Sequence, residues 1–416
     1  MLQTGMDSGN IPAASAGTRA LFGHRPFLLL FLARGCSSFA YQIGAVAIGW
    51  QVYAFTHSVL ALGLIGLVQF IPSAGLTFFA GHAADRFDRR RVAQLCQGAE
   101  GLVALILAWG SLAGWLTVAE IFAAVVVLGA ARSFESPAVS ALLPAVVPEG
   151  MLQKGTALSS GVFQAATILG PALGGFIYAL SPAAPYAVMA LAWLAASLLA
   201  AGLAVDRKVA PKEPPTLKAL FAGVGFVRRD PVILGIISLD LFAVLLGGAT
   251  ALLPVYARDI LHTGPWGLGI LRGAPAVGAL LVSAWMTHRP LSRRVGMRMF
   301  QAVILYGLGT VVFGLSRSLP LTLAALFLMG AADMVSVVIR LSLVQLRTPD
   351  EMRGRVGAVN YLFINASNLL GEFESGATAA LLGTVPAVVL GGAGTVAVAL
   401  LWLRYFPALR NVERLE

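Results

Sequence analysis

Charged side chains stand inside long apolar stretches of this chain, and they are the residues best suited to chemistry. Asp333, in the run LFLMGAADMVSVV (residues 326–338), is an example. A charge at the centre of a membrane-spanning helix costs about 2.5–3.5 kcal/mol on insertion scales, so such residues usually face a cavity or a partner. The candidates are Arg34, Arg132, Glu135, Asp240, Arg272, Asp333, Arg340, Glu372 and Glu374.

Spacing along a helix sorts these charges. Arg132 and Glu135 are three residues apart and share a helix face, which favours a local ion pair. Asp333 and Arg340 are seven apart, too far for direct pairing, so Asp333 requires a partner on another helix, water or a proton. Glu372 and Glu374 point in nearly opposite directions, so we expect at most one to face a cavity and the other to meet the second span.

Burial favours the neutral form of a carboxyl group, which is the property that a proton-coupling site requires. We therefore predict that Asp240, Asp333 or Glu372 takes up a proton and releases it on the other side of a membrane. The alternative is that all three form static salt bridges. Glu100 and Glu120 lie nearer the ends of apolar runs, and we expect them to reach lipid headgroups.

The elements that must position these charges are transmembrane helices. Of the 416 residues, 58% are hydrophobic and 12% are charged, and apolar runs of about 20 residues recur along the whole length. Short connections such as THS at 56–58 require antiparallel neighbours. The predicted spans are 26–55, 59–80, 92–114, 117–146, 156–180, 184–205, 231–257, 266–287, 298–315, 319–346, 356–382 and 385–406.

The basic residues orient these twelve spans. All but six of the 29 lysines and arginines fall on the side of both termini, which the positive-inside rule assigns to the cytoplasm. The exceptions are Arg258 and Arg317 on the other side, and Arg34, Arg132, Arg272 and Arg340 within spans. The formal net charge of +10 is thus a topology signal, and a nucleic-acid partner has little support.

A basic, Pro-containing connection at 206–230 divides the spans into six and six. It yields a cytoplasmic tail (1–25), an N-terminal six-helix bundle (26–205), the linker, a C-terminal bundle (231–406) and a second cytoplasmic tail (407–416). The segment TLKALFAGVGFV in the linker is either a short helix on the membrane surface or unstructured.

The two halves resemble each other at an offset of about 201 residues. LGAARS (128–133) aligns with MGAADM (329–334), VPEGMLQK (147–154) with TPDEMRGR (348–355), and GPALGG (170–175) with GEFESG (371–376). Such a duplication predicts two bundles related by an axis along the membrane normal. Asp333 then corresponds to Arg132, a buried charge of opposite sign.

Two motifs carry a resemblance to the major facilitator superfamily. GHAADRFDRRR resembles its loop signature Gly-x-x-x-Asp-Arg-x-Gly-Arg-Arg, and GPALGG resembles its Gly-Pro-x-x-Gly-Gly antiporter signature. The first comprises Gly81, Asp85, Arg86, Asp88, Arg89 and Arg90, with Asp88 replacing the usual Gly, and the second comprises Gly170, Pro171, Gly174 and Gly175. Arg132 matches the Arg expected in the fourth span. The basic loop MRGRVGAVN (352–360) resembles the branch that contains the enterobactin exporter and drug–proton antiporters.

This resemblance implies an all-α membrane fold of two pseudo-symmetric bundles, whose spans 1, 4, 7 and 10 line a central cavity. It implies that Asp85 binds the N-terminus of the eleventh span and that the arginines help to close the cytoplasmic side. The alternative is that these arginines only determine topology. For polar substrate contacts we consider Tyr41, Gln42, Asn360, Asn365 and Asn368, although hydrogen bonding between helices explains most of them.

Together these features predict a proton-coupled exporter of a small amphipathic molecule, drug or siderophore, working as a monomer in a bacterial cytoplasmic membrane. Uptake or lysophospholipid transport by the same fold, and a non-transporting receptor or scaffold, are the alternatives. Without a phosphate-binding loop or clustered His and Cys, we expect neither an enzyme nor a metal or cofactor site. Cys36 and Cys96 fall in predicted spans, so we expect two inert thiols.

Overall fold

The computed structural model describes residues 20–204, 217–289 and 293–414, which are almost entirely helical. The long helices are α2 (Arg25–Thr56), α3 (Val59–Arg86), α4 (Arg89–Ala113), α5 (Val118–Val146), α6 (Leu152–Leu180), α7 (Ala184–Ala201), α9 (Pro231–Leu246), α11 (Gly264–His288), α12 (Val295–Leu315), α13 (Leu319–Arg347), α14 (Asp350–Leu382) and α15 (Thr384–Tyr405). Shorter elements are α8 (Leu217–Arg229), η1 (Ala249–Leu252), α10 (Leu253–Val255), the π-helix η2 (Tyr256–Ile260) and α16 (Pro407–Arg410).

Local chemistry sets several helix boundaries. The Asp88 carboxylate accepts a hydrogen bond from the backbone N–H of Arg90 and caps the start of α4. Asp230 caps α9 in the same way, directly before Pro231, whose fixed φ suits the first helical position. Gly114 ends α4 at φ 74°, a left-handed conformation that glycine adopts without strain.

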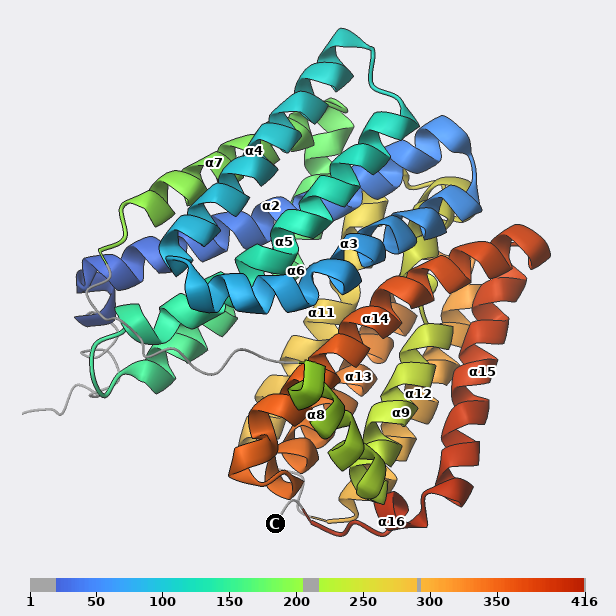
Figure 1. The fold of residues 1–416 in the computed structure, drawn as a ribbon. Helices are drawn as coiled ribbons and strands as arrows, with labels where there is room; N and C mark the ends of the chain where they lie inside the picture. The colour runs from blue at the N-terminus through green and yellow to red at the C-terminus, as the bar shows by residue number, and fades with distance from the viewer. Residues whose placement is uncertain (1–19, 205–216, 290–292, 415–416) are drawn as a thin grey trace, which may run out of the picture.

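The long helices form two groups, the N-terminal bundle (α2–α7) and the C-terminal bundle (α9–α15) (Figure 1). They touch mainly through two helix pairs, α3 with α14 and α6 with α11. In Figure 1 the bundles diverge toward the ends that carry the start of α2 and the end of α15. We call these ends the terminal side of the molecule, and the opposite ends the distal side.

Ten of the described helices are long and apolar enough to cross a membrane. The sequence predicts twelve spans, and the two helices outside the ten are α5 and α14. They have 29 and 33 residues, but Arg132 and Glu135 interrupt the apolar run of α5, and Asn and Glu side chains interrupt that of α14. Both pack against membrane-length helices, so neighbouring helices cover part of their polar surface.

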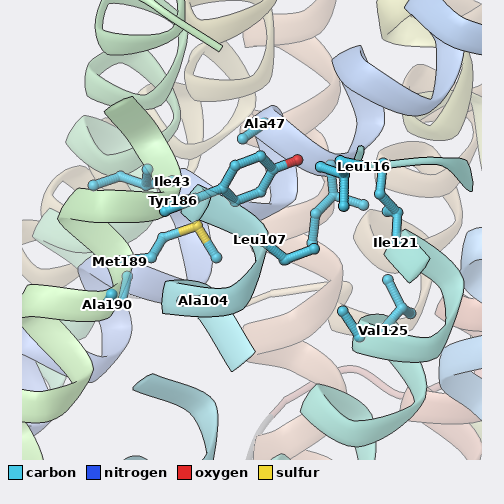
Figure 2. Packing of buried hydrophobic residues seen from close by; sticks show 14 of the residues in the cluster. Ile43, Ala47, Ala104, Leu107, Leu116, Ile121, Val125, Tyr186, Met189 and Ala190 are labelled. Atoms are coloured by element: carbon cyan, nitrogen blue, oxygen red, sulfur yellow. The ribbon is translucent and has the colours of Figure 1, made fainter. Parts of the chain in front are cut away.

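Aromatic and aliphatic side chains fill the interior of the N-terminal bundle. Figure 2 shows Tyr186 and Met189 of α7 next to Leu107 of α4, with Ile121 of α5 close by. Trp193 and Tyr186 are among the largest fully buried side chains of the described residues. Because lipid is as apolar as these residues, dispersion contacts rather than exclusion of water stabilise such packing in a membrane.

Glycines allow the two bundles to touch on the distal side. A Cβ atom on Gly175 of α6 would lie 2.4 Å from the Pro265 carbonyl oxygen of α11, and one on Gly376 of α14 would lie 2.5 Å from the Gly63 Cα of α3. Both contacts are too close for any side chain. The bundles therefore meet through bare backbone on this side, as small residues permit in membranes.

The segments outside the two bundles are partly helical. In the linker, α8 packs against α14, and a Cβ on Gly223 would lie 2.9 Å from the Arg355 carbonyl oxygen, so residues 217–229 form a helix. Residues 205–216 of the linker and most of the predicted N-terminal tail lie outside the described part. At the C-terminus, Leu409 is fully buried, and the Gly296 N–H donates to the Val412 carbonyl at 3.0 Å.

Candidate functional site in a cavity between the bundles

A cavity of about 100 Å³ lies between the two bundles. Its polar lining comes from Tyr41 of α2, Gln69 of α3, Trp193 of α7, Arg272 of α11 and Glu372 of α14. Small and aliphatic residues, Gly44 and Ile48 among them, complete the wall. A few convergent polar groups in an apolar wall are typical of small-molecule sites, but such sites usually enclose about 300–1,000 Å³, so this cavity must widen to admit a drug-sized molecule.

Hydrogen bonds and close packing hold the polar groups of this cavity in place. Arg272 reaches across the interface, and its Nη1 donates to the Ala45 carbonyl of α2 at 3.1 Å. Gln69 Nε2 donates to the Tyr41 hydroxyl oxygen at 3.1 Å. Glu372 abuts Gly66 of α3, where an added Cβ would lie 2.9 Å from the Glu372 Cβ. The cavity wall therefore carries an anchored cation, Arg272, and an acid, Glu372.

A second group of charges lies inside the C-terminal bundle. Asp240 of α9 forms an ion pair with Arg340 of α13, and both side chains are almost fully buried. Asp333 borders a small pocket together with Asp240 and Tyr306, and it has no ion pair with any described residue. Arg132 and Asp333, the sign-inverted pair of the repeat, are thus each held within their own bundle in this state.

A third group lies inside the N-terminal bundle. Arg132 Nη1 is 3.0 Å from Glu135 Oε2, and Glu135 Oε1 accepts hydrogen bonds from Ser37 (2.6 Å) and Gln97 (2.9 Å). Arg34 borders a small pocket with Arg132 and Glu135. Glu100 is only 1% exposed, so the expectation that it reaches lipid headgroups is wrong. The sequence does carry a signal for this burial: Gln97 and Glu100 are three residues apart, so they share one face of α4.

The loop signature divides into described and undescribed parts. Asp88, which replaces the usual Gly, caps α4, and Arg90 Nη1 donates to the Leu203 carbonyl at the end of α7 at 2.6 Å. Arg90 thus binds within its own bundle in this state. Arg86 is exposed and Arg89 half-buried, whereas the surroundings of Gly81 and Asp85 lie outside the described part.

The glycines of the antiporter signature pack α6 against two other helices. A Cβ on Gly170 would lie 2.6 Å from the Gln42 Cβ of α2, and one on Gly174 would lie 3.0 Å from the Ile43 carbonyl oxygen. On the facing side, Gly175 and the Pro171 carbonyl approach Gly269 of α11. This signature therefore packs α6 against α2 in its own bundle and against α11 of the other bundle.

Other polar residues mainly join helices. Asn365 Nδ2 donates to Ser73 Oγ across α14 and α3 at 2.9 Å, and Gln42 Nε2 donates to Thr167 Oγ1 at 3.3 Å. Glu374 accepts from Thr378 on its own helix, whereas Glu372 both faces the cavity and meets α3. Glu372 thus combines the two positions that we expected of the two glutamates, and a contact of Glu374 with the second span stays a prediction.

Sequence reasoning missed two cavity residues, Gln69 and Trp193, because neither is charged and neither belongs to a motif. Their only signal is a polar atom within an apolar run. Among the described residues, no group of three His, Cys, Asp or Glu side chains is arranged to hold a metal ion.

Comparisons with known proteins agree with this architecture. Residues 30–372 match the sequence profile of the Major Facilitator Superfamily. The chain is 28% identical over 397 residues to the enterobactin exporter EntS of Citrobacter koseri and 26% identical to that of Escherichia coli K12, each covering 94% of both chains. Among solved structures, it is similar to a bacterial homologue of the iron transporter ferroportin in an inward-facing state (TM-score 0.70, 18% identity, 93% and 99% coverage) and to the peptide transporter POT (TM-score 0.73, 13% identity, 98% and 100% coverage).

Proposed function

The chain belongs to the major facilitator superfamily and is a multi-pass secondary transporter, and from this premise we propose that it is a proton-coupled exporter of a small amphipathic molecule such as a siderophore or a drug. The similarity to enterobactin exporters over 94% of both chains supports export and this kind of substrate. The family comprises transporters rather than enzymes.

The observation that carries the proposal is the cavity between the bundles. Tyr41, Gln69 and Trp193 face Arg272 and Glu372 there, so each bundle contributes part of one wall. Movement of one bundle against the other would take this cavity apart and expose its residues on the other side. Alternating access by rocking needs this arrangement.

The packing between the bundles supports an assignment of the conformational state. Bare backbone contacts join the bundles on the distal side, and the bundles diverge toward the terminal side (Figure 1). From the distribution of basic residues we infer that both termini lie on the cytoplasmic side, and the bacterial relatives support an inner-membrane location. The structure then corresponds to an inward-facing state, ready to receive substrate from the cytoplasm.

Glu372 is the acid that we assign as the proton-binding group in the cavity. It lies in the same cavity wall as Arg272, so loading the cavity with a substrate would change its environment directly. Asp240 is already committed to Arg340, and Asp333 faces a separate small pocket. Arg272 provides a positive charge for an anionic or phenolic group of the substrate.

A secretion assay with a matched pair of variants tests this proposal. In a bacterial strain that lacks its own enterobactin exporter, the wild-type chain should restore enterobactin secretion. Glu372→Gln should lower secretion about 100-fold or more, because a positioned proton-transfer group contributes about 10²–10⁴-fold in enzymes. Glu374→Gln, the same change two residues away on the same helix, should secrete at the wild-type level, because among the described residues the hydrogen bond of Glu374 is to Thr378 of its own helix.

Two outcomes would contradict the proposal. Wild-type protein in the membrane without secretion of enterobactin or of any compound in a drug panel would oppose export. Equal secretion by Glu372→Gln and wild type would remove Glu372 from the coupling.

A further inference from the structure

Two buried acceptor atoms on α4 lack a hydrogen-bond donor. They are Gln97 Oε1 and Glu100 Oε2, from residues that are each 1% exposed. Rotation of the Gln97 amide would not remove the unpaired acceptor, because Glu135 Oε1 can only accept and therefore requires the Gln97 NH₂ group at 2.9 Å. The amide oxygen is thus directed away from Glu135, and its face of α4 carries acceptors without donors.

An unsatisfied buried acceptor is costly, and a buried ionised carboxylate without a partner is more so. A proton on Glu100 removes the cost of the buried negative charge. It also supplies an O–H donor three residues from Gln97, on the same helix face as the Gln97 oxygen. Arg132 does not satisfy these atoms in the structure: its Nη1 is 3.0 Å from Glu135 Oε2, and no described residue donates to Gln97 Oε1 or Glu100 Oε2.

Among the residues that the structure describes, few charged or titratable groups lie around Glu100. On α5 they are Arg132 and Glu135, and on α4 itself Cys96. Arg34 of α2 borders the pocket beside Arg132 and Glu135 and makes no ion pair with Glu100 among the described residues. From α7 the group nearest this network is Trp193, which is uncharged. Arg132 thus faces two carboxylates and bonds to one.

The same network reaches the wall of the central cavity along two routes. The Arg132 guanidinium lies over the Tyr41 ring, 4.5 Å from its centroid, and Tyr41 lines the cavity. Trp193 Nε1 donates to Ser37 Oγ at 3.3 Å, and Ser37 donates to Glu135 at 2.6 Å. Trp193 lines the cavity as well. Glu135 is therefore connected to both aromatic side chains of the substrate site.

We propose that Glu100 binds a proton inside the N-terminal bundle and that this proton sets the shape and affinity of the substrate cavity through Arg132, Tyr41, Ser37 and Trp193. With Glu100 neutral, Arg132 stays on Glu135 and over Tyr41, as in this structure. When the Glu100 proton leaves, the new carboxylate competes for Arg132 and draws it from Tyr41, which changes the cavity wall. This proposal rests on proton-coupled export and adds a second proton site, separate from Glu372.

Linkage makes the effect reciprocal, because a proton that weakens substrate binding is itself released when substrate binds. In an exporter that exchanges substrate for protons, the deprotonated site binds substrate more tightly. Wild-type affinity for enterobactin should therefore fall by about fivefold or more on acidification, the lower end of common allosteric couplings. Glu100→Gln mimics the protonated side chain and should bind weakly at every pH.

Two measurements on the purified full-length protein in detergent test the proposal. The first is an infrared pH titration of the C=O stretch of protonated carboxyl groups. One component of this band, separate from that of Glu372, should be present in wild type, be absent in Glu100→Gln and return in Glu100→Asp, which retains the acid. The second is enterobactin affinity against pH for the same variants. Glu120→Gln is the matched control, because Glu120 is an exposed glutamate in the first turn of α5 whose carboxylate accepts from the Thr117 N–H, and it should behave as wild type in both.

An unchanged carboxyl band in Glu100→Gln, or an affinity that keeps its wild-type pH dependence, would overturn the inference. Failure of the proposed function would show differently. Wild type would then transport no probe against a proton gradient, while the infrared band and its loss in Glu100→Gln would remain.

Discussion

The contact between α6 and α11 leads to the sharpest prediction about conformational change. Gly175 lies against the Pro265 carbonyl oxygen, which an added Cβ would approach to 2.4 Å, and against Gly269, whose Cα would be 3.1 Å away. Ordinary contacts of a Cβ are 3.4–4 Å, so Gly175→Ala needs a separation of about one ångström. Both opposing atoms belong to backbone, which cannot rotate away as a side chain does.

The cost of this clash falls on one state of the transporter. Overpacking of a tight contact costs about 1–3 kcal/mol. Because the bundles must part here when the distal side opens, the open state does not incur this cost. Gly175→Ala should therefore shift the equilibrium toward distal-side opening by about 5- to 150-fold, while the fold itself is retained.

Spin-label distance measurements read this shift directly. One label at Ser58 and one at Thr384 place probes on the two bundles at the distal side, after replacement of Cys36 and Cys96. Gly175→Ala should increase the population of long distances. Gly161→Ala is the control on the same helix, because its Cβ would meet nothing within 4 Å. Identical distance distributions in the two variants would refute the reasoning.

Two further predictions concern stability. Asp240→Asn leaves Arg340 buried without its counterion and should lower the free energy of unfolding by about 3–5 kcal/mol, measured by thermal and denaturant unfolding in detergent. The double replacement Asp240→Asn with Arg340→Gln should recover much of this loss. An equal loss in both variants would show that the ion pair is not the cause. Asp88→Ala removes the N-cap of α4 and should lower the free energy of unfolding by about 0.5–2 kcal/mol in the same assay. Asp88→Asn keeps a capping oxygen and should lower it less. No difference between the two variants would argue against capping as the reason for Asp at this position.

The helices and the family could be predicted from the sequence because both depend on local patterns. The sequence alone shows the apolar runs, the Gly and Pro positions and the two signatures, with no knowledge of the contacts between helices. The spacing of Arg132 and Glu135 likewise predicts an ion pair, because residues three apart share a helix face.

Contacts between helices could not be predicted in this way. Asp240 and Arg340 are 100 positions apart, and only the packing of α9 against α13 brings them together. Glu100 was misjudged because distance from a helix end is a poor guide to burial, which depends on the neighbours α5 and α7. Trp193 gives no sequence signal as a cavity residue, because only the fold brings it to the cavity and its indole N–H to Ser37.

The most direct test of the central claim is proton flux evoked by substrate. The purified protein is reconstituted in liposomes that contain a pH-sensitive dye, with no pH gradient imposed, and enterobactin is added to the outside. The account predicts proton movement in the direction opposite to the entry of enterobactin, present in wild type and Glu374→Gln and absent in Glu372→Gln. Entry of enterobactin without any proton movement in wild type would contradict proton-coupled exchange.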